Sequence, residues 1–357
     1  AEDPGVAEHL GEAVVEAAVT NILLVPFSEL EADDVDRALE GEPKHQTDRR
    51  RAKKVFWRAM MGTKKIVLRA RQTGRPDLRH AKRVVQPIVD SIMKQDYTLV
   101  GLGALKSHDE YTYAHCVNVS VLSIGIGQTL RLPRQTLADL GVAGLLHDLG
   151  KMTIPGDVLR KPGKLSAEEW GMMRRHPIEG AIMISRMPGL SPVMLDSMRA
   201  CLEHHMNYNR TGYPEIDLDW GQATMSRIVA MADCFDAITA HRAYDTRPRT
   251  PFEGLQLLLG PIRTNFDPAV LWSLVKTVGL YPAGSVLQTA SNHVVLVTSP
   301  NPKDVTRPFC RVLVRPDGTQ PPEDAPETWD PMPDSEHADR VIKPEEHQHN
   351  TNELLAA

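Results

Sequence analysis

The feature that most constrains the fold is a series of helical segments between residues 101 and about 285, each with its own start signal. Ser166 and Glu169 have the spacing of a capping box. Three further segments start with a short polar residue followed by proline, which is typical of an N-cap before the first helical turn. These pairs are Ser191-Pro192, Thr250-Pro251 and Asp267-Pro268. The pattern predicts a mainly α-helical fold with a helical bundle as its core.

The segments on either side of this core have different patterns. Residues 1–100 predict a mostly helical domain with a regulatory or dimerisation role, and residues 22–25 could form a short strand. A basic cluster at residues 49–75 has no interleaved aromatic residues, which favours a solvated helix face over a nucleic-acid site. Residues 286–314 contain short strand patterns and predict a small β accessory segment. Residues 315–357 are acidic and rich in proline, so we expect a largely disordered tail.

The chain has 14 histidines but only 4 cysteines, and the cysteines form no CxxC pair. This usage argues against a disulfide framework or a thiolate zinc site and favours a reducing, cytoplasmic location. No run approaches the ~18 to 20 apolar residues that span a bilayer, and the acidic N-terminus does not resemble a secretory signal.

An adjacent histidine and aspartate, His147 and Asp148, follow the apolar segment 138–146. A buried aspartate is costly unless it is paired or bound to a cation, and imidazole with carboxylate suits iron, manganese or zinc. Other histidines and aspartates are predicted near helix ends, and His176 is expected to end the helix that starts at Ser166. These residues are His115, His176, His204, His205 and Asp233, with Asp236 one turn beyond. Zinc alone would need only four ligands, so the set indicates two Fe or Mn ions.

Three motifs carry a resemblance to a known family. The segment His147-Asp148-Leu149-Gly150-Lys151 resembles the HDxGK motif of HD-domain phosphohydrolases. His204-His205 followed by Thr211-Gly212-Tyr213-Pro214 resembles the HHxxxxxxGYP motif of the HD-GYP subgroup. Residues 233–239, with Arg242 and Tyr244 after them, are similar to the DxFDAxT…RxY segment of the same family. The resemblance covers roughly residues 105–285 and places the HD-GYP catalytic domain at residues 101–285.

The resemblance implies a metal-dependent phosphodiesterase that hydrolyses cyclic di-GMP to pGpG and, in many members, on to GMP. By position it implies that Asp148 bridges two metals, that Lys151 faces the phosphate, and that Tyr213 and Arg242 shape the nucleotide pocket. The implied metal ligands are His115, His147, Asp148, His176, His204, His205 and Asp233.

Physical chemistry is consistent with these roles. Two metal ions roughly 3.5 to 4 Å apart can hold a bridging hydroxide as the nucleophile and neutralise the phosphate oxygens. Lys151 would stabilise charge on the phosphoryl oxygens, and Arg242 could stack on guanine or bind its carbonyl edge. The alternative for Lys151 is a cation that only complements the end of a helix.

Several positions depart from the family pattern. Met206 stands where a glutamate is usual, and Asn209-Arg210 replaces the usual Asp-Gly before the GYP motif. Asp245 replaces a basic residue that faces the phosphate. Tyr111 occupies the position of a glutamate that binds a third metal in some members, so we expect two metals.

Three functions therefore remain open at this point. The first is hydrolysis of cyclic di-GMP, and the second is the same chemistry on another cyclic dinucleotide such as cyclic GMP-AMP. The third is a catalytically weak receptor that binds the nucleotide and signals through its N-terminal domain. We expect no DNA partner and no membrane span, and a homodimer through residues 1–100 is a further hypothesis.

Overall fold

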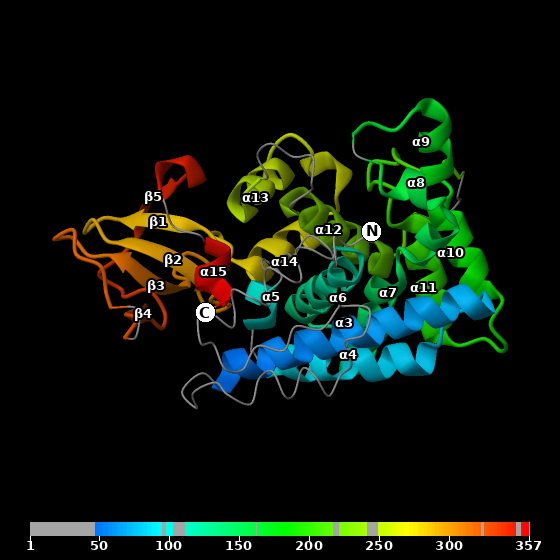
Figure 1. Ribbon diagram of the computed structural model, residues 1–357, viewed down its shortest axis with the longest axis horizontal. Helices are drawn as coiled ribbons and strands as arrows, with labels where there is room; N and C mark the ends of the chain where they lie inside the picture. The colour runs from blue at the N-terminus through cyan, green and yellow to red at the C-terminus, as the bar shows by residue number, and fades with distance from the viewer. Residues whose placement is uncertain are drawn as a thin grey trace, which may run out of the picture.

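The computed structural model describes residues 47–94, 98–102, 111–161, 163–216, 221–240, 249–322, 325–347 and 351–356. Within them the fold is mainly α-helical with short strands near the C-terminus, which confirms the predicted fold class (Figure 1). The strand suggested at residues 22–25 lies outside the described residues, as do Arg242, Tyr244 and Asp245.

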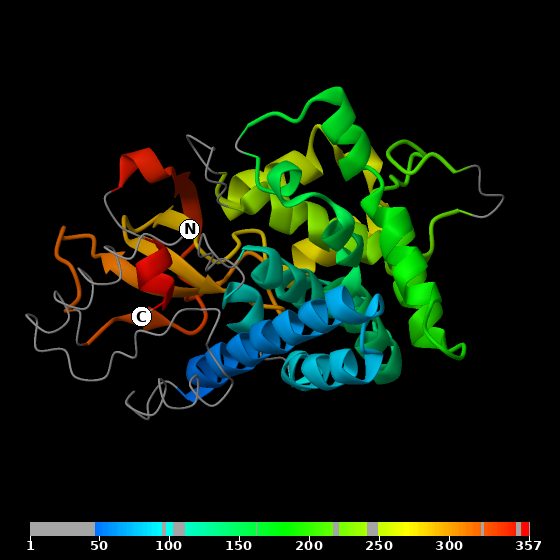
Figure 2. The same ribbon diagram turned by 45° about the vertical axis from the view of Figure 1, so that its right-hand side comes forward.

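Helices α3 (Thr47–Thr73) and α4 (Leu78–Met93) form a pair along one side of the molecule (Figures 1 and 2). Their buried side chains, among them Met60 on α3 and Ile88 on α4, join one hydrophobic core with α6 (Tyr111–Thr129) and α7 (Arg134–Leu146). The short helix α5 (Thr98–Leu102) packs against α3 and α6. Residues 47–93, which the sequence assigns to an N-terminal domain, thus share a core with the helices that follow.

The helices that surround the candidate site follow α7 in the chain. They are η2 (Leu149–Thr153), α8 (Gly156–Leu159), α9 (Ala167–Met173), α10 (His176–Ser185), α11 (Pro192–Glu203), α12 (Thr224–Thr239), α13 (Pro251–Leu259), η3 (Arg263–Asn265) and α14 (Pro268–Val278). The capping box of Ser166 with Glu169 is present at the start of α9. Thr250 and Asp267 cap α13 and α14 with their side chains, as predicted.

The prediction that His176 ends the helix from Ser166 is wrong. Helix α9 ends at Met173, and His176 is the first residue of α10. Pro177 explains the break, because a proline within a helix would clash with the carbonyl four residues earlier, here that of Met173. The proline instead lies in the first turn of α10, where its missing N–H costs nothing.

The C-terminal strands form one antiparallel sheet in the order β4-β3-β2-β1-β5. The strand patterns predicted within residues 286–314 are present as β1 (Val286–Thr289), β2 (Val294–Ser299) and β3 (Phe309–Val314). Asn292 adopts a positive φ of 68° in the turn between β1 and β2. The sheet buries its own apolar cluster, which includes Leu287, Val295 and Val312.

The expectation of a largely disordered tail after residue 315 is also wrong for the described residues. They contain β4 (Thr328–Trp329), β5 (Ala338–Ile342), η4 (Pro344–Glu346) and α15 (Thr351–Ala356). Strand β5 pairs with β1, and Met332, Ile342 and Leu355 are buried. The composition of this segment did not reveal its order, because its few apolar residues pack against a sheet formed by earlier residues. The backbone of that sheet also supplies hydrogen-bond partners for the segment.

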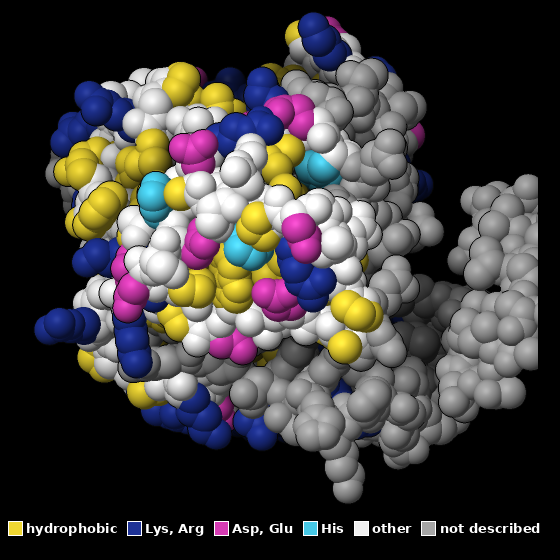
Figure 3. Space-filling model, turned by 90° about the vertical axis from the view of Figure 1, so that its left-hand side faces the viewer, with side chains coloured by type: hydrophobic (Ala, Val, Ile, Leu, Met, Phe, Trp, Pro, Cys, Tyr) yellow, Lys and Arg dark blue, Asp and Glu magenta, His cyan; other side chains and the backbone are white. Residues whose placement is uncertain are grey.

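The sheet lies at one end of the molecule, and α9, α10 and α11 lie at the other (Figures 1 and 2). On the face at the sheet end, acidic, basic and apolar side chains are interspersed among the described residues (Figure 3). No described helix combines the length and hydropathy needed to cross a membrane.

Candidate metal centre

Asp148 is the centre of a buried histidine cluster. His147 is the C-cap of α7, and Asp148 follows it in the turn that leads into η2. Gly144 lets this helix lie close to α6, because a Cβ there would stand 3.1 Å from the Cα of Ser120. The end of α7 is thereby held deep in the core, and the Asp148 side chain is only 3% exposed.

The two carboxylate oxygens of Asp148 face different histidines. Its Oδ2 lies 3.5 Å from Nε2 of His115 and 3.4 Å from Nε2 of His147. Its Oδ1 lies 3.3 Å from Nε2 of His176 and 3.7 Å from Nε2 of His204. Each oxygen of this carboxylate therefore faces its own pair of imidazole nitrogens.

Asp233 on α12 supplies a second carboxylate on one side of this bridge. Its Oδ1 lies 3.2 Å from Nε2 of His115 and 3.7 Å from Nε2 of His147. Its Oδ2 lies 3.9 Å from Nδ1 of His205. The structure therefore brings together all seven residues that the sequence predicts as metal ligands.

The outer nitrogens of the histidines fix how the rings are oriented. Nδ1 of His147, His176 and His204 each donates to a backbone carbonyl three residues earlier, at 2.7, 2.7 and 2.8 Å. A carbonyl can only accept, so in the neutral ring the Nε2 lone pair faces Asp148. This outer hydrogen bond is the usual support of a metal-binding histidine.

His115 is supported by a carboxylate in place of a carbonyl. Its Nδ1 lies 2.7 Å from Oδ2 of Asp236, and Nδ2 of Asn118 donates to Oδ1 of the same carboxylate at 3.0 Å. Both His115 and Asp236 are buried. The sequence placed Asp236 near the site but assigned it no role; its position here is behind a candidate ligand.

These residues fit a divalent cation. Nε2 of His147 and Oδ1 of Asp148 are buried without a hydrogen-bond partner. Nε2 of His176 and His204 lie 3.2 Å apart although both rings donate through Nδ1, so two lone pairs face each other in the neutral state. A cation would satisfy all of these atoms at once. The ligand atoms of Asp148, His176, His204 and His205 lie within 4.8 Å of one another, as do those of His115, His147 and Asp148.

The electrostatics divide the histidines into two groups. Burial alone would lower the pKa of His147, but the charges of Asp148 and Asp233 outweigh burial and raise it to about 9. Burial lowers the pKa of His204, and burial with the neighbouring His204 holds the pKa of His205 well below its usual value. The pKa of Asp148 stays far below its ordinary value despite burial, because Lys151 and His147 stabilise the charge.

Lys151 and Tyr213 lie where the cluster meets solvent. The Lys151 ammonium contacts Oδ2 of Asp148 at 2.5 Å, and its side chain is 28% exposed. The Tyr213 ring lies 4.6 Å from the ring of His205, whose side chain is 25% exposed. Lys151 thus places a partly exposed cation at the edge of the cluster.

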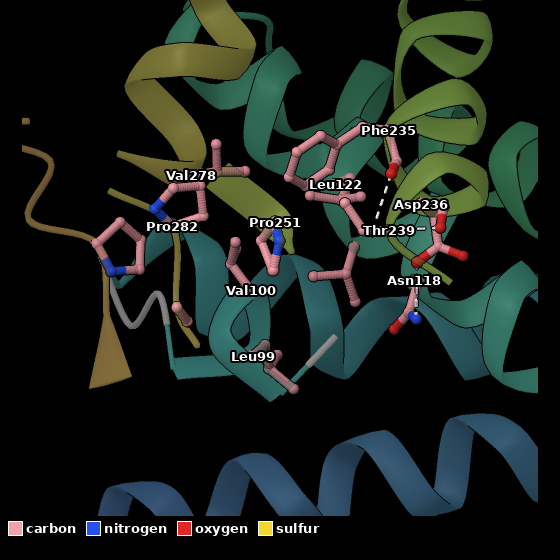
Figure 4. A pocket seen from close by; sticks show the side chains of 13 residues that line it. Leu99, Val100, Asn118, Leu122, Phe235, Asp236, Thr239, Pro251, Val278 and Pro282 are labelled. Atoms are coloured by element: carbon pink, nitrogen blue, oxygen red, sulfur yellow. Dashed lines mark hydrogen bonds between the residues drawn. The ribbon is translucent and has the colours of Figure 1, made fainter. Parts of the chain in front are cut away.

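A small cavity of about 40 Å³ lies beside Asp236 (Figure 4). It is lined mostly by apolar side chains, and Asn118 and Asp236 face one another in its wall. None of the seven clustered residues lines this cavity. This cavity is therefore separate from the histidine cluster.

Comparisons with known proteins agree with this geometry. Residues 102–270 match the HD domain family. The chain is 34% identical over 299 residues to the cyclic di-GMP phosphodiesterase PA4108 of Pseudomonas aeruginosa, a match that covers 84% of this chain and 70% of that protein. A solved structure of Bd1817, an HD-GYP-type protein from Bdellovibrio bacteriovorus, has the same fold with a TM-score of 0.53 and 17% identity, over 68% of this chain and 76% of that one. This chain belongs to the HD-GYP family.

Another relative is named for a different substrate. The 3'3'-cGAMP-specific phosphodiesterase 2 of Vibrio cholerae is 29% identical over 173 residues, covering 48% of this chain and 33% of that protein. This chain thus spans most of the Pseudomonas relative but only a third of the Vibrio one.

Two glycines of the HD-GYP motifs hold the cluster in shape. A Cβ on Gly150 would lie 1.9 Å from the carbonyl oxygen of His176, so only glycine lets η2 lie against α10. Gly212 has a φ of 95°, and a Cβ there would lie 2.2 Å from the carbonyl oxygen of His205. The backbone N–H of Tyr213 then donates to that oxygen at 3.1 Å, which folds the GYP segment back onto the histidine pair.

Glu203 is a buried residue beside the cluster that sequence reasoning missed. It is buried just before His204, accepts from the backbone N–H of Ala223 at 2.8 Å and pairs with Arg199 at 2.9 Å. The carboxylate thereby ties the end of α11 to the start of α12, which carries Asp233. A glutamate at the end of a helix gives no sequence signal for this long-range contact.

Proposed function

We propose that this HD-GYP protein is a metal-dependent phosphodiesterase that hydrolyses cyclic di-GMP to pGpG or, after a second hydrolysis, to GMP. The observation that carries the proposal is Asp148, whose two oxygens face two separate pairs of buried histidines. The 34% identity to a Pseudomonas cyclic di-GMP phosphodiesterase over 84% of the chain supports the choice of substrate.

We further propose that the cluster holds two Fe or Mn ions. His115, His147 and Asp233 would bind the first, and His176, His204 and His205 the second, with Asp148 shared between them. The donors are imidazole nitrogens and carboxylate oxygens without a thiolate, and this set suits non-haem iron or manganese. When bound, such ions supply an activated water and neutralise the phosphate charge.

The residues of the chain contribute positioning and charge. Hydrolysis adds one water: a P–O bond forms, the bond from phosphorus to the 3′-oxygen breaks, and that oxygen gains a proton. Lys151, at the solvent edge of the cluster, is placed to hold a non-bridging phosphate oxygen as charge builds on it. The hydrogen bonds at Nδ1 keep His147, His176 and His204 oriented without reorganisation during the reaction.

A second candidate substrate is 3'3'-cGAMP, because a Vibrio relative is specific for that nucleotide. The metal cluster recognises the phosphodiester, which both nucleotides share, so it cannot discriminate between them. Discrimination must come from residues that contact the bases, and Arg242, the predicted guanine contact, lies outside the described residues.

The test combines metal analysis with a hydrolysis assay. Protein purified without air or chelators should contain about two Fe or Mn per chain, and chromatography should show cyclic di-GMP converted to pGpG and then GMP. Asp148→Ala and His147→Ala should each lose metal and turnover. His293→Ala is a matched control, because His293 pairs with Ser291 in the connection between β1 and β2, outside the cluster.

Each alternative has its own outcome in this test. Faster turnover of 3'3'-cGAMP than of cyclic di-GMP would select the second substrate. A metal-loaded protein that binds either nucleotide without turnover would select the receptor hypothesis. Failure to take up any metal would contradict the proposal. The predicted cytoplasmic location and the homodimer through residues 1–100 remain predictions.

A further inference from the structure

An exposed tryptophan lies beside the metal cluster and has no role in the function proposed above. Trp170 on α9 is 46% exposed, although an indole gains more from burial than most side chains. Its ring lies 6.0 Å from the ring of Tyr213, edge to face at 74°. Tyr213 in turn lies against His205 of the cluster, so a continuous aromatic surface runs from the cluster to solvent.

The surroundings of Tyr213 connect this surface to the phosphate-binding end of the site. Its ring lies 6.4 Å from the ring of His176, a second histidine of the cluster, in addition to its contact with His205. The ring bridges the cluster and Trp170.

Arg174 adds a cation to the same surface. It is the C-cap residue of α9, four residues after Trp170, and its guanidinium lies 5.2 Å from the centre of the Tyr213 ring. An ion pair with Glu215 at 3.0 Å orients it, and its side chain is still 38% exposed. An exposed indole beside an oriented guanidinium is a surface that suits a planar, electron-rich base attached to a phosphate.

We propose that Trp170, together with Arg174, forms a stacking subsite for a purine base of the cyclic dinucleotide whose phosphodiester occupies the metal cluster. This inference rests on the proposed function, because it is the phosphodiester at the cluster that brings a base to this position. The competing explanation is that Trp170 only packs against Tyr213. A side chain that only packs would be replaced by any apolar residue of similar size, whereas a stacking residue requires a π face.

The experiment measures binding and turnover of cyclic di-GMP by the metal-loaded protein. Trp170→Ala should raise the KM and the Kd for cyclic di-GMP roughly 5- to 150-fold, the range expected for the loss of one base–aromatic stack. Metal content and kcat should stay near those of the unmodified protein. Trp170→Phe should restore most of the affinity, and Trp170→Leu should not.

Tryptophan fluorescence gives a readout that a packing role would not produce. Binding of cyclic di-GMP, followed by stopped flow before turnover, should quench fluorescence, and Trp170→Phe should abolish most of this quench. Trp272→Phe is the matched control, because Trp272 is 56% exposed on α14 and belongs to neither the cluster nor α9. An unchanged Kd in Trp170→Ala, full rescue by Trp170→Leu, or a quench that persists in Trp170→Phe would overturn the subsite.

The two proposals fail in distinguishable ways. If the unmodified protein shows no turnover or binds no metal, the phosphodiesterase proposal is wrong. If the protein binds cyclic di-GMP but substitution of Trp170 leaves the Kd unchanged, only the stacking subsite is wrong.

Discussion

Substitution of Asp236 by asparagine should weaken metal binding although Asp236 contacts no predicted metal position directly. The carboxylate holds Nδ1 of His115 at 2.7 Å, and both side chains are at least 96% buried. Asparagine keeps the volume and one acceptor oxygen but removes the charge that makes His115 a stronger ligand. Loss of such an outer partner typically weakens metal affinity by about 10- to 100-fold, or roughly 1.4 to 2.8 kcal/mol.

The assay is a competition titration of Mn²⁺ or Fe²⁺ against a chelator of known affinity, with thermal unfolding of the metal-free protein in parallel. Asp90→Asn serves as the control, because Asp90 is 43% exposed and pairs with Arg134 far from the cluster. We expect the control to bind metal as the unmodified protein does. Asp236→Asn should bind one metal more weakly while the second, on the His176 side of Asp148, changes less.

The reasoning would be refuted by equal metal affinities in Asp236→Asn and the unmodified protein. It would also be refuted by equal weakening of both metals, since His115 faces only one side of the Asp148 carboxylate. A fall in thermal stability that accounts for the whole loss of affinity would show that Asp236 serves folding and does not position His115.

Three further predictions concern Gly150, His147 and Met332. Gly150→Ala should lower the free energy of unfolding, measured by urea denaturation, by about 1 to 3 kcal/mol, because a Cβ there meets the backbone of His176. Gly171→Ala is the control and should be neutral or slightly stabilising, because the space around Gly171 is open. Metal uptake should release protons, because the pKa of His147 is raised to about 9 in the metal-free protein and the ring must lose its proton to bind a metal. Below that pH, metal affinity should therefore rise roughly tenfold per pH unit for each proton displaced. Calorimetry of metal binding in buffers of different ionisation enthalpy measures the protons released, and a heat that is the same in every buffer would contradict the prediction. Met332→Ala should lower the free energy of unfolding by about 2 to 5 kcal/mol, because the Met332 side chain is fully buried. Met332→Leu, which nearly preserves the volume, should lower it by less than about 1.5 kcal/mol. Equal stability of both variants and the unmodified protein would show that the segment after residue 315 does not pack on the sheet.

Much of the helical core could be predicted because its signals are local. The caps at Ser166, Thr250 and Asp267 satisfy backbone groups within one turn, so a few neighbouring residues decide where each helix begins. The ligand set could also be proposed from sequence, because its members stand in short motifs of unusual composition. The break at Pro177 was local too, but the expectation that His176 ends a helix overlooked it.

What only the tertiary structure decided depends on contacts between distant residues. Asp236 meets His115 across 121 positions of the chain, and no local pattern in either segment specifies that pairing. The tail is a second case: β5 gains its hydrogen bonds from β1, about 50 residues earlier, so its own composition did not reveal a strand. The sequence by itself determined the helices and the kinds of ligand available. The fold alone turned Asp148 into a carboxylate shared by two histidine pairs, because hydrogen bonds and burial across the core set the direction of each side chain.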